Sequence, residues 1–167
     1  CGRAFTVNGS NNKILDCRID FCYPTTILAS DTSKNLLVKG CVVTRGSVKL
    51  FDPTRTGTVA AVATGFIIRG EDNVIEENVV CYCYGEGIAA SKRGKRQIIR
   101  YNISHTNLHW SLGVNGSIGA KIYGNIVYWC DNMYSSVFGP KARLFVAGDE
   151  DKGGETSYDT VIYNNLF

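Results

Sequence analysis

The amino-acid sequence predicts an all-β solenoid, a parallel β-helix of about six coils with two loop insertions. Three observations support this prediction: one motif recurs about every 24 residues, the motif has the pattern of short strands, and the sequence lacks long amphipathic helical patterns. A repeat of this length cannot bury its apolar face alone, whereas stacked copies bury a continuous core. The 167 residues, 44% of them hydrophobic and 20% charged, fit one such domain over residues 1–167.

The repeated motif consists of an apolar residue, two spacers, an Asn or Cys, one spacer and usually a second apolar residue. Six copies begin at Ile14, Val38, Ile75, Ile99, Ile122 and Ile162. We expect these six residues to form one inward stack, about 4.8 Å apart like neighbouring strands. The fourth positions of the motif, here called the ladder positions, are Cys17, Cys41, Asn78, Asn102, Asn125 and Asn165.

The spacing of the ladder positions locates the insertions. Successive positions are 24, 37, 24, 23 and 40 residues apart, so the two long intervals contain extra residues, within 45–64 and within 131–159. Insertions in a solenoid become loops, which either line a binding groove or serve as packing flaps. A second strand signal, rich in Ile, Leu and Gly, occurs in most coils, at residues 26–28, 65–67, 87–89 and 112–114.

The Asn ladder positions are predicted to be structural. An Asn amide tolerates the dihedral angles of a tight turn, and it can donate to and accept from the equivalent residue of the next coil. A column of such amides satisfies its own hydrogen bonds.

The phrase at residues 85–88 (GEGI), with the motif copies at residues 99–103 and 122–127, resembles right-handed parallel β-helix proteins of the pectate-lyase-like superfold. The resemblance covers about residues 11–167 and implies a right-handed helix. Many members of this superfold cleave acidic polysaccharides, while others are tailspikes, adhesins or surface-layer parts. The resemblance therefore implies a secreted or cell-surface domain that binds an anionic polysaccharide and that, as an enzyme, would cleave it. A non-catalytic sugar-binding module, or a structural part of a surface layer, sheath or fibre, stays open as an alternative.

Two groups of residues are candidates for the polysaccharide site. A basic loop, joined by Arg69 and Arg100, would bind carboxylates or sulfates, or it is a solvated turn that discourages edge pairing. The loop residues are Lys92, Arg93, Lys95 and Arg96. A polysaccharide lyase also needs a charge neutraliser, a base and an acid, for which His105, His109 and Arg100 are the candidates. The RxPxxR segment and the paired-Asp motif of known relatives are missing, so the sequence leaves open whether the protein is an enzyme.

Composition restricts the other partners. A net charge of +3 is small for a dedicated nucleic-acid binder, and the longest apolar stretch, residues 57–68, is too short to span a bilayer. No cofactor motif is present in the sequence, so no cofactor is expected. Asp149, Glu150 and Asp151 would either ligate Ca²⁺ or form a solvated hairpin tip.

The seven cysteines weakly favour an extracellular protein. Cys17 and Cys41 occupy equivalent positions in adjacent coils, about 5 Å apart and within disulfide reach, or they pack as small hydrophobes. Cys22, Cys83 and Cys130 recur two coils apart, which is too far for direct bridges. The chain ends inside a motif copy, so we expect its last coil to be covered by further chain or by self-assembly with another molecule.

Overall fold

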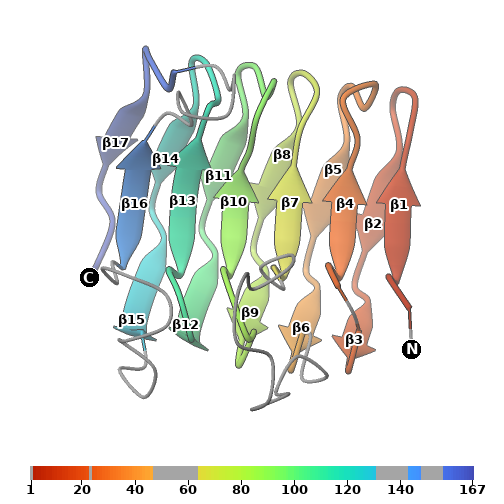
Figure 1. The fold of residues 1–167 in the computed structure, drawn as a ribbon, viewed down its shortest axis with the longest axis vertical. Helices are drawn as coiled ribbons and strands as arrows, with labels where there is room; N and C mark the ends of the chain where they lie inside the picture. Colours follow the sequence, from red (N-terminus) through yellow and green to blue (C-terminus); the bar gives the residue numbers. More distant parts are fainter. Residues whose placement is uncertain (1, 23, 47–63, 131–142, 148–155) are drawn as a thin grey trace, which may run out of the picture.

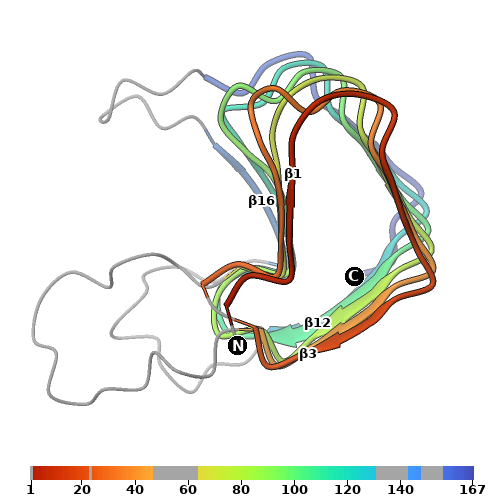
Figure 2. The same cartoon turned by 90° about the vertical axis from the view of Figure 1, so that its right-hand side faces the viewer.

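The computed structural model describes residues 2–22, 24–46, 64–130, 143–147 and 156–167. Within these residues the chain is a right-handed parallel β-helix without α-helices, built from three parallel sheets (Figure 1). One strand of each sheet makes a coil, and the view along the stack in Figure 2 shows successive coils lying over one another. The predicted fold class is confirmed.

Each sheet takes every third strand of the chain. Sheet I contains β1 (Phe5–Val7), β4 (Ile27–Ala29), β7 (Phe66–Ile68), β10 (Ile88–Ala90), β13 (Leu112–Asn115) and β16 (Leu144–Ala147). Sheet II contains β2 (Lys13–Leu15), β5 (Leu37–Lys39), β8 (Val74–Glu76), β11 (Ile98–Arg100), β14 (Lys121–Tyr123) and β17 (Val161–Tyr163). Sheet III contains β3 (Arg18–Asp20), β6 (Val42–Thr44), β9 (Val79–Cys81), β12 (Ile103–Asn107) and β15 (Ile126–Cys130).

The core is filled by the inward-facing residues of these short strands. The six motif residues that start at Ile14 pair in register from coil to coil, which confirms the predicted inward stack. All of them are buried except Ile162 in the last coil, which is 38% exposed. Sheet I contributes a parallel stack that includes Ile27, Phe66, Ile88 and Leu112, each fully buried.

The chain turns between sheets through residues with left-handed backbone conformation, stacked in three columns. Corner I–II, between sheets I and II, contains Asn11, Asn35, Asp72, Arg96, Gly119 and Asp159. Corner II–III contains Asp16, Gly40, Glu77, Tyr101, Gly124 and Asn164. Corner III–I, which follows sheet III, contains Phe21, Arg45, Tyr82, Thr106 and Trp129. The φ angles in the three columns lie between 46° and 67°.

The Asn ladder runs along corner II–III, as predicted. The Nδ2 atoms of Asn78, Asn102 and Asn125 donate to the Oδ1 atoms of the next Asn along the ladder, at 2.9, 3.0 and 2.9 Å. The same Oδ1 atoms accept backbone N–H groups of the preceding coil, and Asn78 Oδ1 accepts from the Cys41 backbone at 2.9 Å. The amides therefore satisfy buried backbone groups as well as one another.

The second predicted insertion proves to be two. Leu144–Ala147 forms β16 and pairs residue by residue with β13, so a strand lies between residues 131–142 and 148–155. The sequence pattern missed this strand because extra residues on both sides separate it from Asn125 and from Asn165, whereas β7, which also follows an insertion, keeps its usual distance to the next ladder position. The first insertion and residues 131–142 interrupt the same corner, between sheets III and I, whereas residues 148–155 interrupt corner I–II.

Among the described cysteines, Cys17, Cys41, Cys81 and Cys83 are free thiols. The Cys17 thiol donates to the Leu15 carbonyl at 3.2 Å and the Cys41 thiol to the Lys39 carbonyl at 3.5 Å. The disulfide considered for this pair is therefore absent, and the two side chains occupy the ladder column as small, hydrogen-bonded groups.

Val161, Ile162 and Leu166 of the last coil are exposed, and the expected self-assembly stays a prediction.

Candidate functional site

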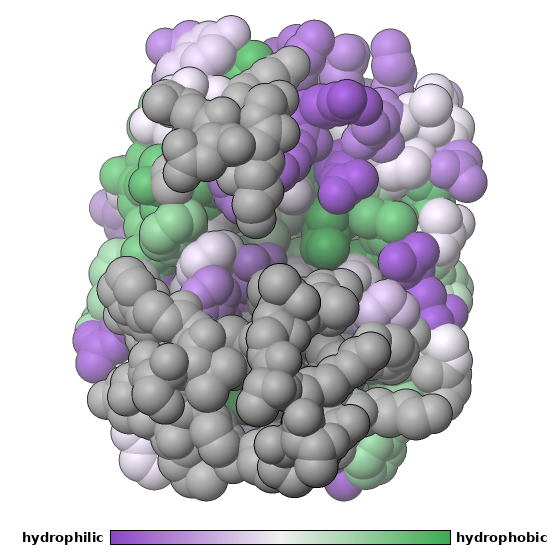
Figure 3. Space-filling view, viewed as in Figure 1, coloured by the Kyte–Doolittle hydropathy of each residue, from purple (hydrophilic) through white to green (hydrophobic). Residues whose placement is uncertain are grey.

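The outer face of sheet I carries a band of apolar and small residues that crosses the strands. Alternation turns Ile27 and Ala29 into the core and Leu28 outward, and the same holds in the other coils. The outward positions in register, here called the apolar band, are Leu28, Ile67, Ala89, Gly113 and Phe145. Figure 3 shows this face, with hydrophobic side chains across its middle and hydrophilic side chains gathered above them.

One edge of the apolar band is cationic. The turns that follow β4, β7 and β10 (residues 30–36, 69–73 and 91–97) carry six cations against three carboxylates, an excess of three positive charges. Arg93 Nη1 donates to Asp31 Oδ2 at 2.9 Å, and Arg69 Nη1 lies 3.8 Å from Asp31 Oδ1. The Arg93 side chain is 72% exposed, so it stays open to a ligand despite this pair. The buried Arg69 Nε has no hydrogen-bond partner within the described part of the chain.

Carboxylates compensate Lys95 and Arg96 of the predicted basic loop. Arg96 donates twice to Asp72, at 2.7 Å each, and these bonds lower the pKa of the Asp72 carboxyl. Lys95 Nζ lies 4.0 Å from Glu71 Oε1. The structure thus brings Arg69, but not Arg100, together with the basic loop, and it adds acidic partners that the sequence analysis missed. The signal was present in the register, because Glu71 and Lys95 are equivalent positions of adjacent coils.

The other edge of the apolar band holds a carboxylate–imidazole pair. Glu86 and His109 are 13% and 12% exposed, and His109 Nδ1 lies 3.9 Å from Glu86 Oε1. Thr64 Oγ1 donates to Glu86 Oε2 at 3.0 Å, which fixes one side of the carboxylate. The His109 ring contacts Trp110 with centroids 3.8 Å apart. Sequence analysis missed Glu86, although it lies in the GEGI phrase at residues 85–88.

Trp110 joins this pair to the apolar band. Its indole stacks on Phe145, with centroids 4.2 Å apart and planes inclined by 6°. The ring also lies against Gly113, where an added Cβ would sit 2.5 Å from Trp110 Nε1, so glycine is required there. The Trp110 Nε1 atom is buried without a hydrogen-bond partner among the described residues. The indole N–H of Trp110 and the Glu86–His109 pair therefore border the same apolar band.

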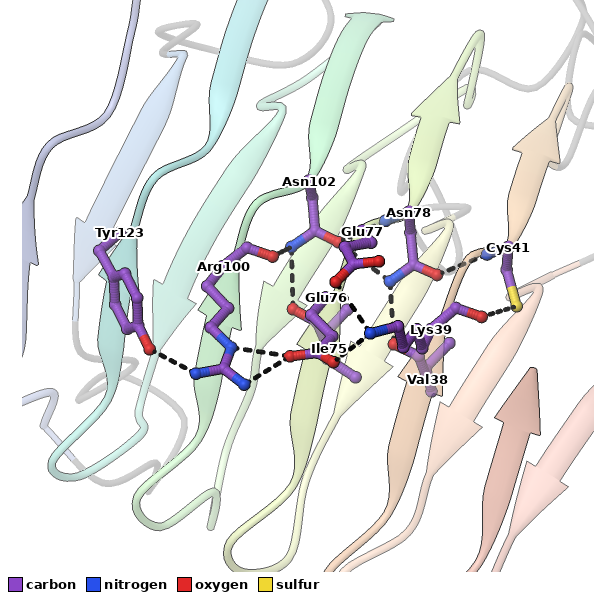
Figure 4. Close-up of polar contacts among 10 residues, drawn as sticks. All are labelled: Val38, Lys39, Cys41, Ile75, Glu76, Glu77, Asn78, Arg100, Asn102 and Tyr123. Atoms are coloured by element: carbon purple, nitrogen blue, oxygen red, sulfur yellow. Dashed lines mark hydrogen bonds and ion pairs between the residues drawn. The ribbon is translucent and has the colours of Figure 1, made fainter. Parts of the chain in front are cut away.

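Arg100 lies elsewhere, on the outer face of sheet II (Figure 4). It donates to Glu76 Oε2 at 2.8 Å through Nε and to the Tyr123 hydroxyl at 2.9 Å, while Lys39 donates to Glu76 Oε1 at 3.1 Å. Burial raises the pKa of Glu76, but the hydrogen bonds from Arg100 and Lys39 outweigh it and the net change is downward. The bonds to Tyr123 and Glu76 raise the pKa of Arg100. Arg100 thus belongs to an ion-pair network between coils.

His105 lies on a third face, on β12 of sheet III. Its ring stacks on Tyr128 at 4.6 Å and meets Tyr82 edge-on at 5.8 Å, and burial lowers its pKa. The three predicted catalytic residues, Arg100, His105 and His109, therefore do not form one group. Of the three, the structure places His109 beside the apolar band and next to a carboxylate.

Comparison of the chain with known protein families, curated proteins and solved structures gives no match. In the described residues, no group of three or more His, Cys, Asp or Glu side chains is placed to hold a metal ion. The acidic run Asp149–Glu150–Asp151, considered for Ca²⁺, lies outside the described residues. The part of the chain that the structure describes contains no helix long and apolar enough to cross a membrane.

Proposed function

We propose that the outer face of sheet I binds an anionic polysaccharide, as many proteins of the pectate-lyase-like superfold do. The observation that carries this proposal is the apolar band, which runs between a cationic edge and the Glu86–His109 pair. All three features run parallel to the helix axis. An extended glycan along that axis would rest its apolar C–H faces on Leu28 and Ile67 and direct acidic groups toward Arg69 and Arg93. Such a ligand implies an extracellular or cell-surface location.

Asp31 supports binding because it holds both arginines near one place. Each guanidinium presents several donors in a fixed plane that matches a carboxylate. One carboxylate shared between two cations leaves a net positive charge, and restraining the side chains before binding reduces the entropy lost on binding.

His109 is the residue we propose for proton transfer, with Glu86 as the residue that positions it. A neutral imidazole accepts a proton near neutral pH, and the adjacent carboxylate stabilises the imidazolium that forms. The partial burial of both side chains strengthens their electrostatic interaction.

Binding is tested by affinity electrophoresis on polygalacturonate and alginate at low and moderate salt. The double variant Arg69→Ser/Arg93→Ser should bind at least tenfold more weakly, with a smaller salt dependence. The matched control Arg18→Ser/Lys121→Ser removes two exposed cations from sheets III and II and should bind like the wild type. Equal binding by both variants would overturn the proposed site.

Cleavage is tested by the ultraviolet absorbance of unsaturated products released from the same polymers. His109→Ala should lower kcat by about 100-fold or more, whereas His105→Ala on sheet III should leave it unchanged. Glu86→Gln should lower kcat and shift its pH profile. Binding without any product would identify a non-catalytic binding module, and absence of binding to acidic glycans would favour the structural role in a surface layer or fibre.

A further inference from the structure

Corner III–I has an unusual residue content for a column of left-handed turns. An L-residue other than glycine in this conformation costs about 1–2 kcal/mol, and Asn, Asp and Gly tolerate it best. Eight of the ten left-handed residues described at corner I–II and four of the six at corner II–III are of these types. None of the five left-handed residues described at corner III–I is Asn, Asp or Gly. Three of the five, Phe21, Tyr82 and Trp129, are aromatic.

Burial does not explain these aromatic residues. Phe21 is 50% exposed, Tyr82 is 56% exposed and Trp129 is 76% exposed. Large rings held in a strained backbone conformation and left mostly in solvent do not stabilise the core. Local rules of this kind are broken chiefly at functional sites.

The rings form a row along the helix axis. Tyr82 meets His105 edge-on, and His105 stacks on Tyr128 with their planes inclined by only 3°. Tyr82, His105 and Tyr128 come from three successive coils and contact one another. The row runs from Phe21 in the first coil to Trp129 in the fifth, and its position in the second coil is taken by Arg45 rather than by a ring. Four coil spacings of about 4.8 Å give it a length of about 19 Å. We call these five residues the aromatic row.

The aromatic row carries little net charge. Arg45 lies over the first ring of the row, with its guanidinium 4.1 Å from the centre of Phe21. Arg45 is paired with Asp20, to which Nε donates at 2.9 Å, and these bonds lower the pKa of Asp20. Burial lowers the pKa of His105, which favours the neutral form of its imidazole. In charge, the aromatic row differs from the cationic edge of sheet I.

We infer that the aromatic row is a second binding site, which takes an uncharged polysaccharide chain lying parallel to the helix axis. Sugar rings offer flat apolar faces for stacking and hydroxyls for the polar tips of Tyr and Trp, and a linear glycan repeats such rings as the row does. A single-stranded nucleic acid would stack similarly but requires cations along its backbone, which the row does not supply. This site does not depend on the function proposed for sheet I.

The test uses variants that remove the rings and relieve the backbone. Tyr82→Asn/Trp129→Asn places residues that favour the left-handed conformation, so its Tm should equal or exceed that of the wild type. Tyr101→Asn is the matched control, because Tyr101 is an exposed, left-handed tyrosine of corner II–III. Binding is measured by affinity electrophoresis on soluble mannan, xylan and hydroxyethylcellulose, and by fluorescence, since a ligand should shield Trp129 from acrylamide quenching.

The wild type and Tyr101→Asn should bind at least one of these neutral polymers, and the double variant should bind it at least tenfold more weakly. The double variant should keep polygalacturonate binding, whereas Arg69→Ser/Arg93→Ser should keep neutral-glycan binding, so the two sites are tested separately. Three outcomes would overturn the inference: no neutral polymer binds, Tyr101→Asn loses binding equally, or a proline-rich peptide binds the row and the neutral polymers do not.

Discussion

Corner II–III and corner III–I turn the chain through the same backbone conformation with different residues. At corner II–III each left-handed residue precedes a ladder position, and from the third coil onward the ladder amides hydrogen-bond along the column. At corner III–I no such ladder of amides runs along the column in the described residues, and aromatic side chains project into solvent. The contacts of the side chains therefore distinguish the two corners. They assign a structural role to the turns of corner II–III and favour the proposed binding role for those of corner III–I.

Tyr101 shows why exposure alone does not separate the two corners. It is left-handed and 54% exposed, yet its ring packs across Gly124, where an added Cβ would lie 2.6 Å from the ring, and edge-on against Tyr123. Glycine at position 124 supplies both the left-handed turn and the space for this ring. Tyr101 thus contributes to packing, whereas no ring contact of Trp129 occurs among the described residues.

The largest expected effect comes from breaking the ladder at its centre. Asn102→Ala removes the Oδ1 atom that accepts from the backbone N–H and the side-chain amide of Asn78. It also removes the Nδ2 group that donates to the Ile75 carbonyl and to Asn125 Oδ1. Leaving such buried groups unpaired should destabilise the protein by about 3 kcal/mol. Urea unfolding followed by circular dichroism measures the change.

Asn165→Ala is the matched control for this prediction. Asn165 makes the same kinds of bond but is only partly buried, so water replaces part of what is lost and a smaller destabilisation is expected. Equal stability of Asn102→Ala and the wild type would contradict the structural role of corner II–III.

A smaller effect is expected at Glu76, beside the same ladder. Glu76→Gln removes the charge that Arg100 and Lys39 share, at a cost of about 2 kcal/mol. Because the pKa of Glu76 is lowered on folding from its ordinary 4.5, its stabilisation is complete above that pH and is lost as the pH falls through the folded-state value. The stability difference between wild type and variant, measured by urea unfolding from pH 7 to pH 3, should shrink in acid. A difference that stays constant with pH would show that Glu76 acts through its shape alone.

The smallest expected effect has the opposite sign. Tyr82→Asn should stabilise the protein by about 0.5 kcal/mol, because it relieves an exposed left-handed residue without removing core contacts. Tyr101→Asn should destabilise it by a similar amount, because it removes the packing against Gly124 and Tyr123. Differential scanning calorimetry of the two variants makes the comparison. A loss of stability in Tyr82→Asn would mean that corner III–I is structural like corner II–III.

Much of the fold was predictable because its signals repeat within each coil. The ladder positions, the inward stack and the strands of sheet I at Ile27, Phe66, Ile88 and Leu112 all recur at short, regular offsets. Strand β16 was missed because residues are inserted both before and after it, so it keeps its usual offset from neither neighbouring ladder position. Of the candidate site, the association of Arg69 with the basic loop was predictable, since both follow strands of sheet I.

By itself, the sequence determined the coil: its length, its turn residues, its inward column and the Asn ladder, because each depends on contacts within a coil or with the equivalent position of the next. Only the tertiary structure decided which side chains share a face. Arg100, His105 and His109 lie close in the sequence but on different sides of the solenoid, because the chain passes two corners between them. Asp31 and Arg93, 62 residues apart, become partners because stacking brings two turns of different coils to one edge.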